Sequence, residues 1–167
     1  MRSSVKEVGR WLPWCSSAYD ELKAAEYIRS VGNATSHGSE FSFGVFTNDS
    51  AESHIGGTSL NRIYWAASCA NLGFWMATKA AGRGHGTIAA QLMCRFGYQT
   101  LGLHRIEIQV EVGNEGSRRI AEKLGGQLEG TLRQKIRRAD GWSDAWLYGL
   151  LADTAAADGA GEVPCAC

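Results

Sequence analysis

The chain has 167 residues, in which 17 Lys and Arg balance 17 Asp and Glu, and hydrophobic residues make up 44%. This length fits one domain with a packed core, and the zero net charge excludes a general electrostatic attraction to nucleic acid or to a membrane surface. No apolar run approaches the roughly 18 residues of a membrane-spanning helix, and no N-terminal signal region is visible. We therefore expect a cytoplasmic protein without a nucleic-acid or membrane partner.

The chain contains five cysteines, which are Cys15, Cys69, Cys94, Cys165 and Cys167. They form no C-x-x-C pair and have no His at metal-ligand spacing, so we expect no metal site, and their odd number argues against a secreted disulfide scaffold. The last two lie in the Ala- and Gly-rich stretch 155–167, which we expect to be a disordered tail after a domain of residues 1–154.

The first predicted elements are a helix and a hairpin. Ser17-x-x-Asp20 is typical of a helix start, and apolar residues follow it at helical spacing. Residues 41–46 and 55–60 are predicted strands on either side of the polar turn 47–53, and residues 72–77 are a third short strand.

A glycine-rich segment, Gly82-Arg83-Gly84-His85-Gly86, follows the third strand and precedes an amphipathic helix. The helical spacing predicts that Ile88, Leu92 and Phe96 form the buried face of this helix, with Ala89 and Met93 on its flank.

Residues 104–112 alternate strictly and predict the next strand. One face would hold Ile106, Ile108, Val110 and Val112, and the other Glu107, Gln109 and Glu111. A second helix is predicted to start near Asn114 and to run over 117–124.

Two final strands, 128–138 and 142–151, are joined by the hairpin signal Asp140-Gly141. This order of elements predicts an α/β (α+β) fold in which helices pack on a mixed sheet.

The glycine-rich segment is the strongest local signal for a ligand. Alternate glycines between a strand and a helix allow close approach of the backbone, and consecutive amides at the positive end of a helix suit a diphosphate. The segment lacks the Lys of a P-loop, and its G-x-G-x-G spacing differs from the dinucleotide fingerprint. A flexible turn before a core helix is the alternative interpretation of the segment taken alone.

Several segments in this order resemble the GNAT acyltransferases, most closely the branch that acetylates the N-termini of ribosomal proteins. They are Trp11-Leu12-Pro13-Trp14, Gly73-Phe74-Trp75, the glycine-rich segment with its helix, Leu103–Glu107, Asn114-x-x-Ser117, Glu122–Gly125, Leu128–Arg133, and Asp144 before Tyr148. The resemblance implies a mostly antiparallel mixed sheet with a central splayed pair of parallel strands. Only ten residues precede Trp11, so we expect the usual first strand of that fold to be missing.

The resemblance also implies a donor, which would be acetyl-CoA, another acyl-CoA or a phosphopantetheine thioester. Its phosphates would be held by Gly82, Arg83, Gly84, His85, Gly86 and Thr87, and its pantetheine arm by Trp75, Met76 and Ala77. Asn114 and Ser117 would lie near its thiol. The chain departs from the family at Ala81, where Gln or Arg usually begins the loop.

For proton transfer the resemblance points to Ser117 as donor to the leaving sulfur. The alternative is that Asn114 caps the helix and that Ser117 is an ordinary first-turn residue. Candidates for the base or acid are Glu107, Glu111, Asp144 and Tyr148. Their structural alternatives are a solvated strand face for the two glutamates, an arginine ion pair for Asp144 and core packing for Tyr148.

Taken together, these features favour an N-acyltransferase in which a primary amine attacks the thioester directly in a ternary complex. The acceptor would be a protein N-terminus or a small-molecule amine. The alternatives are an acyl carrier protein as donor and a non-catalytic CoA-binding module. A basic patch of Arg133, Lys135, Arg137 and Arg138 is either a solvated strand or attracts an acidic acceptor or carrier. Because a missing first strand exposes a sheet edge, we expect a homodimer.

Overall fold

The computed structural model describes residues 4–12, 14–16, 18–48, 50 and 52–152. The expected tail at 155–167, with Cys165 and Cys167, lies outside the described residues, as does Ser17 of the predicted helix start. Asp20 of that motif is the N-cap of the helix, because its side chain accepts a hydrogen bond from the backbone N–H of Lys23 at 2.9 Å.

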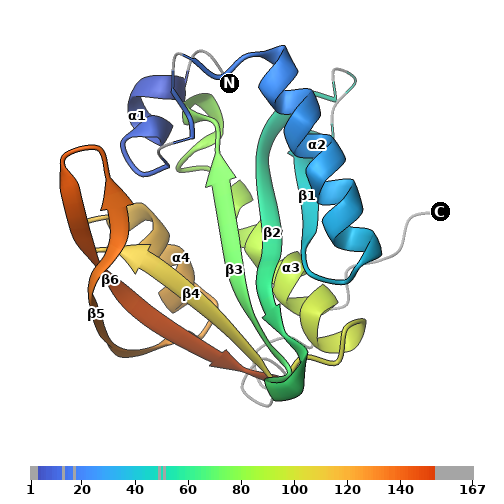
Figure 1. The fold of residues 1–167 in the computed structure, drawn as a ribbon, viewed down its shortest axis with the longest axis vertical. Helices are drawn as coiled ribbons and strands as arrows, with labels where there is room; N and C mark the ends of the chain where they lie inside the picture. The colour runs from blue at the N-terminus through green and yellow to red at the C-terminus, as the bar shows by residue number, and fades with distance from the viewer. Residues whose placement is uncertain (1–3, 13, 17, 49, 51, 153–167) are drawn as a thin grey trace.

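A six-stranded mixed sheet runs through the molecule in the order β1-β2-β3-β4-β6-β5 (Figure 1). The strands are β1 (Phe41–Phe46), β2 (His54–Tyr64), β3 (Cys69–Met76), β4 (Arg105–Glu111), β5 (Gln127–Arg138) and β6 (Gly141–Leu151). All neighbours are antiparallel except β3 and β4, which are parallel. The predicted mixed sheet is confirmed.

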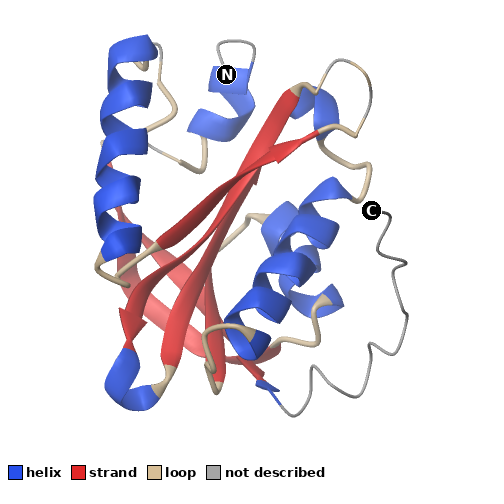
Figure 2. Cartoon of the chain, turned by 90° about the vertical axis from the view of Figure 1, so that its right-hand side faces the viewer, coloured by secondary structure: helices blue, strands red, loops and turns tan. Residues whose placement is uncertain are grey.

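Helices cover both faces of the sheet (Figures 1 and 2). They are α1 (Val5–Gly9), α2 (Glu21–Ser36), α3 (His85–Gln99) and α4 (Glu115–Lys123), with short 3-10 turns at Trp65–Ala67 and Thr78–Ala80. Seen edge-on in Figure 2, α1 and α2 lie on one side of the sheet and α3 and α4 on the other. The α3–α4 side contains the main hydrophobic core.

The alternation predicted for β4 places its apolar side chains in this core. Ile106, Ile108 and Val110 are buried there together with Leu60 of β2 and Leu72 of β3. The prediction was wrong for Val112, which follows the end of the strand and is 43% exposed.

The buried face of α3 differs from the predicted one, because it is centred one to two positions further along the sequence. Ala89, Ala90, Met93 and Cys94 are buried, whereas Ile88 and Leu92 are about half exposed. The reason is close packing through small residues. A Cβ on Gly97 would lie 3.0 Å from Leu60 Cδ1, so α3 lies against the sheet along its Ala and Gly side.

β1 is an edge strand of the sheet, and the described residues before it form the helices α1 and α2. The strand that usually begins this fold is therefore not present among the described residues 4–40. One backbone edge of β1 pairs with β2, and no other described strand pairs with its second edge.

Candidate functional site

The parallel strands β3 and β4 separate soon after they meet (Figure 1). They pair only at Cys69 with Arg105, Ala70 with Ile106 and Asn71 with Glu107. Beyond Asn71, β3 continues beside β2, and β4 continues beside β6. A cavity of about 820 Å³ lies between the separated strands, bordered also by α1, the glycine-rich loop and α4. This volume is typical of a ligand site.

The glycine-rich loop forms one wall of this cavity, and its backbone requires glycine. Gly82 and Gly84 have φ values of 73° and 85°, in the left-handed region that disfavours L side chains. Gly84 is also the N-cap of α3, and the N–H of Ile88 donates to its carbonyl at 3.1 Å. The N–H groups of the turn before Ile88 have no acceptor within the helix, so the loop and the helix dipole together favour an anion.

The first turn of α3 lies very close to α4. A Cβ on Gly86 would be 3.1 Å from Ile120 Cδ1 and 3.3 Å from Met76 Cγ. Gly86 therefore allows the loop, the end of β3 and α4 to enclose the cavity together.

The start of α4 forms another wall of the cavity. Asn114 is the N-cap, and its Oδ1 accepts a hydrogen bond from the backbone N–H of Ser117 at 3.2 Å. Both residues border the cavity. The predicted cap is confirmed, and it engages the amide of Ser117, not its hydroxyl.

Most residues expected at the donor border this one cavity. They are Trp75, Met76, Gly82, Gly84, Gly86, Thr87, Asn114 and Ser117. Three others do not border it. Ala77 is buried, and its N–H donates to the carbonyl of Ile55 at 2.7 Å. Arg83 and His85 border a second cavity, of about 800 Å³, between β1 and α3.

Among the candidate proton-transfer groups, Glu111 and Ser117 both border the cavity. Its carboxylate is held by Arg138, whose Nε donates to Glu111 Oε1 at 2.9 Å while Nη2 pairs with Oε2. The two side chains are 10% and 13% exposed. Glu111 therefore faces the site as a member of a nearly buried ion pair.

Glu107 belongs to a different cluster, at the end of the sheet where β3 and β4 still pair. Arg105 Nε donates to Glu107 Oε1 at 3.0 Å, and Arg105 Nη1 donates to Glu129 Oε1 at 2.8 Å. Arg105 lowers the pKa of Glu129 by hydrogen bonding to its charged form. Glu107 does not border the cavity.

Asp144 and Tyr148 also lie outside the cavity. Asp144 Oδ1 accepts a hydrogen bond from the N–H of Gln134 at 2.7 Å. Gln134 has a φ of 49° where the β5–β6 register shifts, so Asp144 supports an irregular strand. Tyr148 is buried in the core, and this burial raises its pKa.

The cavity has charged and polar neighbours that the sequence analysis did not identify as site residues. They are Glu7, Arg62, Asn71, Thr78, Gln109, Arg119 and Lys123. Arg119 and Lys123 lie one turn apart on the helix that Asn114 begins, and this i, i+4 spacing was a usable signal. Arg62 gave no such signal, because its position depends on an irregularity in β2. Its Nη1 donates to Oε1 of Gln109 in β4 at 3.1 Å.

No described helix is both long and apolar enough to cross a membrane. In the described part of the chain, no three His, Cys, Asp or Glu side chains are grouped to hold a metal ion.

Comparison with known proteins agrees with this geometry. Residues 1–127 match the family described as the acetyltransferase (GNAT) domain. The probable N-acetyltransferase YjcK of Bacillus subtilis is 34% identical over 113 residues, which are 67% of this chain and 62% of that protein. The ribosomal-protein-serine acetyltransferase of Escherichia coli is 29% identical over 146 residues, 86% of this chain and 77% of that protein.

Among solved structures, a ribosomal L7/L12 α-N-protein acetyltransferase, RimL, in complex with coenzyme A has a TM-score of 0.82 to this chain. The superposition covers 91% of this chain and 84% of that one at 19% identity, so it shows a shared fold.

Proposed function

The chain belongs to the GNAT acetyltransferase family, and we propose that it transfers an acetyl group from acetyl-CoA to a primary amine by direct attack in a ternary complex. The observation that carries the proposal is that the glycine-rich loop, the separated strands and the start of α4 all border one cavity.

The loop fits the diphosphate of the donor. Its N–H groups have no helical acceptor, and Gly82 and Gly84 leave open space, because a Cβ at either position would meet no atom within 4 Å. Arg119 and Lys123 on α4 border the same cavity and add positive charge on this side.

The separated strands fit the pantetheine arm, which contains two amides. One edge of β3 pairs with β2 as far as Met76, and its other edge loses β4 after Asn71. The backbone groups on that second edge need partners, and an extended arm with amides satisfies them in the manner of an added strand. Trp75 and Met76 lie along this edge.

The thioester supplies the activated acyl group, and the protein side chains orient the reactants and handle the proton. The Ser117 hydroxyl is our candidate for hydrogen bonding to the leaving sulfur, since the cap of α4 uses only its backbone N–H. Glu111 is our candidate for accepting the proton of the amine through water, because Glu107 and Asp144 do not border the cavity.

The test combines turnover with binding. Release of free thiol from acetyl-CoA would be measured with a panel of primary amines that includes short peptides, free amino acids and polyamines. Calorimetry would measure CoA binding separately. We expect CoA to bind and at least one amine to be acetylated. Binding of CoA without turnover on any amine would favour a non-catalytic CoA-binding module. Turnover only with a carrier-protein thioester would show that the donor is that thioester and not acetyl-CoA.

A further inference from the structure

Arg62 has an unfavourable backbone conformation near the end of β2. Its φ is 50°, in the left-handed region, where the β2–β3 register shifts between Asn61 and Tyr64. Non-glycine residues in this region are uncommon and occur at functional sites when the surrounding structure holds them there. The irregularity changes the direction of the Arg62 side chain, which reaches past β3 to Gln109 of β4.

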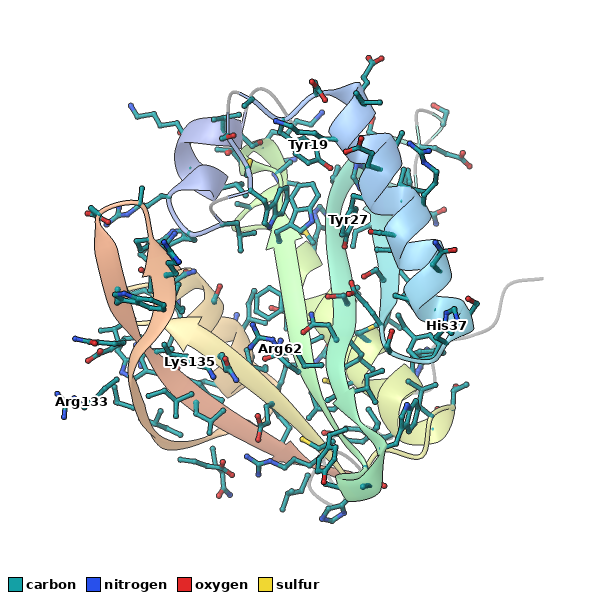
Figure 3. The ribbon with its side chains drawn as sticks, viewed as in Figure 1. Tyr19, Tyr27, His37, Arg62, Arg133 and Lys135 are labelled. Atoms are coloured by element: carbon teal, nitrogen blue, oxygen red, sulfur yellow. The ribbon has the colours of Figure 1, made fainter. Side chains whose placement is uncertain are left out.

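This contact fixes the face of the sheet on which the guanidinium lies. Gln109 alternates with Ile108 and Val110, which are buried in the core on the α3–α4 side. Arg62 therefore lies on the opposite face, in front of the region where β3 and β4 separate (Figure 3). It borders the cavity from the side of α1 and α2, whereas the glycine-rich loop and α4 border it from the donor side.

The guanidinium of Arg62 differs from the paired arginines nearby. Arg105, Arg118 and Arg138 each form ion pairs with one or two glutamates. In the described residues Arg62 forms no ion pair, and its one recorded side-chain hydrogen bond is to the neutral amide oxygen of Gln109. Most of its five N–H donors remain for a ligand.

The acids that border the cavity do not neutralise Arg62. Glu111 is paired with Arg138, and Glu7 Oε2 accepts a hydrogen bond from Thr78 Oγ1 at 3.2 Å. The acceptor side of the cavity thus presents an exposed cation beside polar groups. A guanidinium binds a carboxylate with two parallel hydrogen bonds, and it repels a polyamine.

We propose that Arg62 binds a carboxylate of the acceptor, so that the preferred acceptor is an amine that also carries a carboxylate. This inference rests on the proposed function. Two sources share the chemistry, a free amino acid and a peptide with Asp or Glu near its N-terminus. The amine would lie in the cavity between Arg62 and the pair Ser117 and Glu111.

The experiment uses variants that keep the unusual backbone. Arg62→Asn removes the guanidinium with a residue that tolerates positive φ, and Arg62→Lys keeps a charge without the planar fork. Arg133→Asn is the matched control, because Arg133 does not border the cavity and points away from it at the outer edge of β5 in Figure 3.

Calorimetry on the protein saturated with CoA would measure binding of four probes. They are free glutamate, a peptide beginning Ser-Asp, the matched peptide beginning Ser-Asn, and spermidine. We expect a carboxylate probe to bind best and Arg62→Asn to weaken it at least tenfold. Arg62→Lys should recover part of the loss, and Arg133→Asn should bind as the wild type does. Which carboxylate probe binds identifies the source.

Equal binding of the Ser-Asp and Ser-Asn peptides with no binding of glutamate, or a preference for spermidine, would overturn the inference. A carboxylate preference that persists in Arg62→Asn would overturn it too. None of these readouts needs turnover, so failure of this inference and failure of the proposed acetyl transfer are distinguishable.

Discussion

Asn114 and Ser117 are joined by a hydrogen bond that engages the side chain of the first residue and the backbone of the second. Asn114 Oδ1 accepts from the Ser117 N–H at 3.2 Å, at the start of α4. The stability of this helix start therefore depends on the Asn114 side chain, and the Ser117 hydroxyl remains available to the cavity that both residues border.

Ser117→Ala should lower the turnover number while the affinity for CoA stays nearly unchanged. The substitution removes one oxygen and leaves the capped N–H in place. A hydrogen bond that forms mainly in the transition state affects kcat more than binding, and general-acid contributions are on the order of 10²-fold or more. Steady-state kinetics and CoA calorimetry check the two parts separately.

Asn114→Ala is the matched comparison for Ser117→Ala. Loss of the cap should lower the free energy of unfolding by about 1 kcal/mol, whereas Ser117→Ala should leave it nearly unchanged. Near-normal turnover in Ser117→Ala would show that Ser117 is an ordinary first-turn residue of α4 with no role in proton transfer. A loss of CoA binding would assign the hydroxyl to the donor instead.

Gly84→Val should raise the dissociation constant of CoA at least tenfold, which corresponds to about 1.4 kcal/mol. Gly84 has a φ of 85°, and Val at this position would force the loop into another conformation and turn its N–H groups away from the diphosphate. Gly102→Val is the control, because Gly102 has a φ of 66° but does not border the cavity. Calorimetry with equal affinity in both variants would contradict the assignment of the loop.

The features that the sequence predicted well depend on local signals. The turn–helix pattern around Gly84 and the alternation of Ile106, Ile108 and Val110 need only neighbours in the chain to be recognised. The cap at Asn114 is equally local. These signals were sufficient to predict the glycine-rich loop, the central strand and the start of α4. That these elements surround one donor site was implied by the family resemblance and not by the local signals.

The remaining features depend on contacts between distant segments. Glu111 is held by Arg138, 27 residues later, and no spacing in the sequence indicates that pair. Arg62 reaches Gln109, 47 residues away, only because β2 is irregular at that point. The face of α3 was misjudged because the small residue Gly97 allows closer packing than the larger residues Ile88 and Leu92 do.

The open edge of β1 leads us to expect a homodimer. Phe43 and Phe46 of β1 and Leu92 of α3 are 50%, 58% and 49% exposed around the second cavity. A second copy that covers this surface would bury apolar area and satisfy the strand edge. Light scattering at micromolar concentration should therefore give twice the mass of one chain.

Leu92→Glu should convert this dimer to a monomer, because it places a charge in the apolar surface beside β1. Ile28→Glu is the control, since Ile28 is 70% exposed on α2, on the other side of the sheet. A wild-type protein that is monomeric and does not aggregate would contradict the expectation. A dimer that Ile28→Glu disrupts and Leu92→Glu does not would move the interface to α2.

Removing one partner of the ion pair between Glu111 and Arg138 should strongly destabilise the protein. Its side chains are 10% and 13% exposed, so Glu111→Gln leaves an almost buried guanidinium without its counter-charge. Breaking such a pair costs roughly 3–5 kcal/mol. Arg118→Gln removes two pairs with Glu115 and Glu122 on the surface of α4, and it should destabilise the protein much less, because water screens exposed pairs. Urea unfolding would measure the loss in the free energy of unfolding for each variant relative to the wild type, provided that the m value is unchanged.

A double substitution separates this structural role from catalysis by Glu111. In Glu111→Leu with Arg138→Met, apolar side chains of similar volume replace the pair, and stability should return towards that of the wild type. If Glu111 accepts the proton of the amine, turnover stays low in the double variant even when the protein is fully folded. Turnover that recovers together with the midpoint of urea unfolding would show that Glu111 acts only through stability, and the base would then be sought in a bound water or in the acceptor itself.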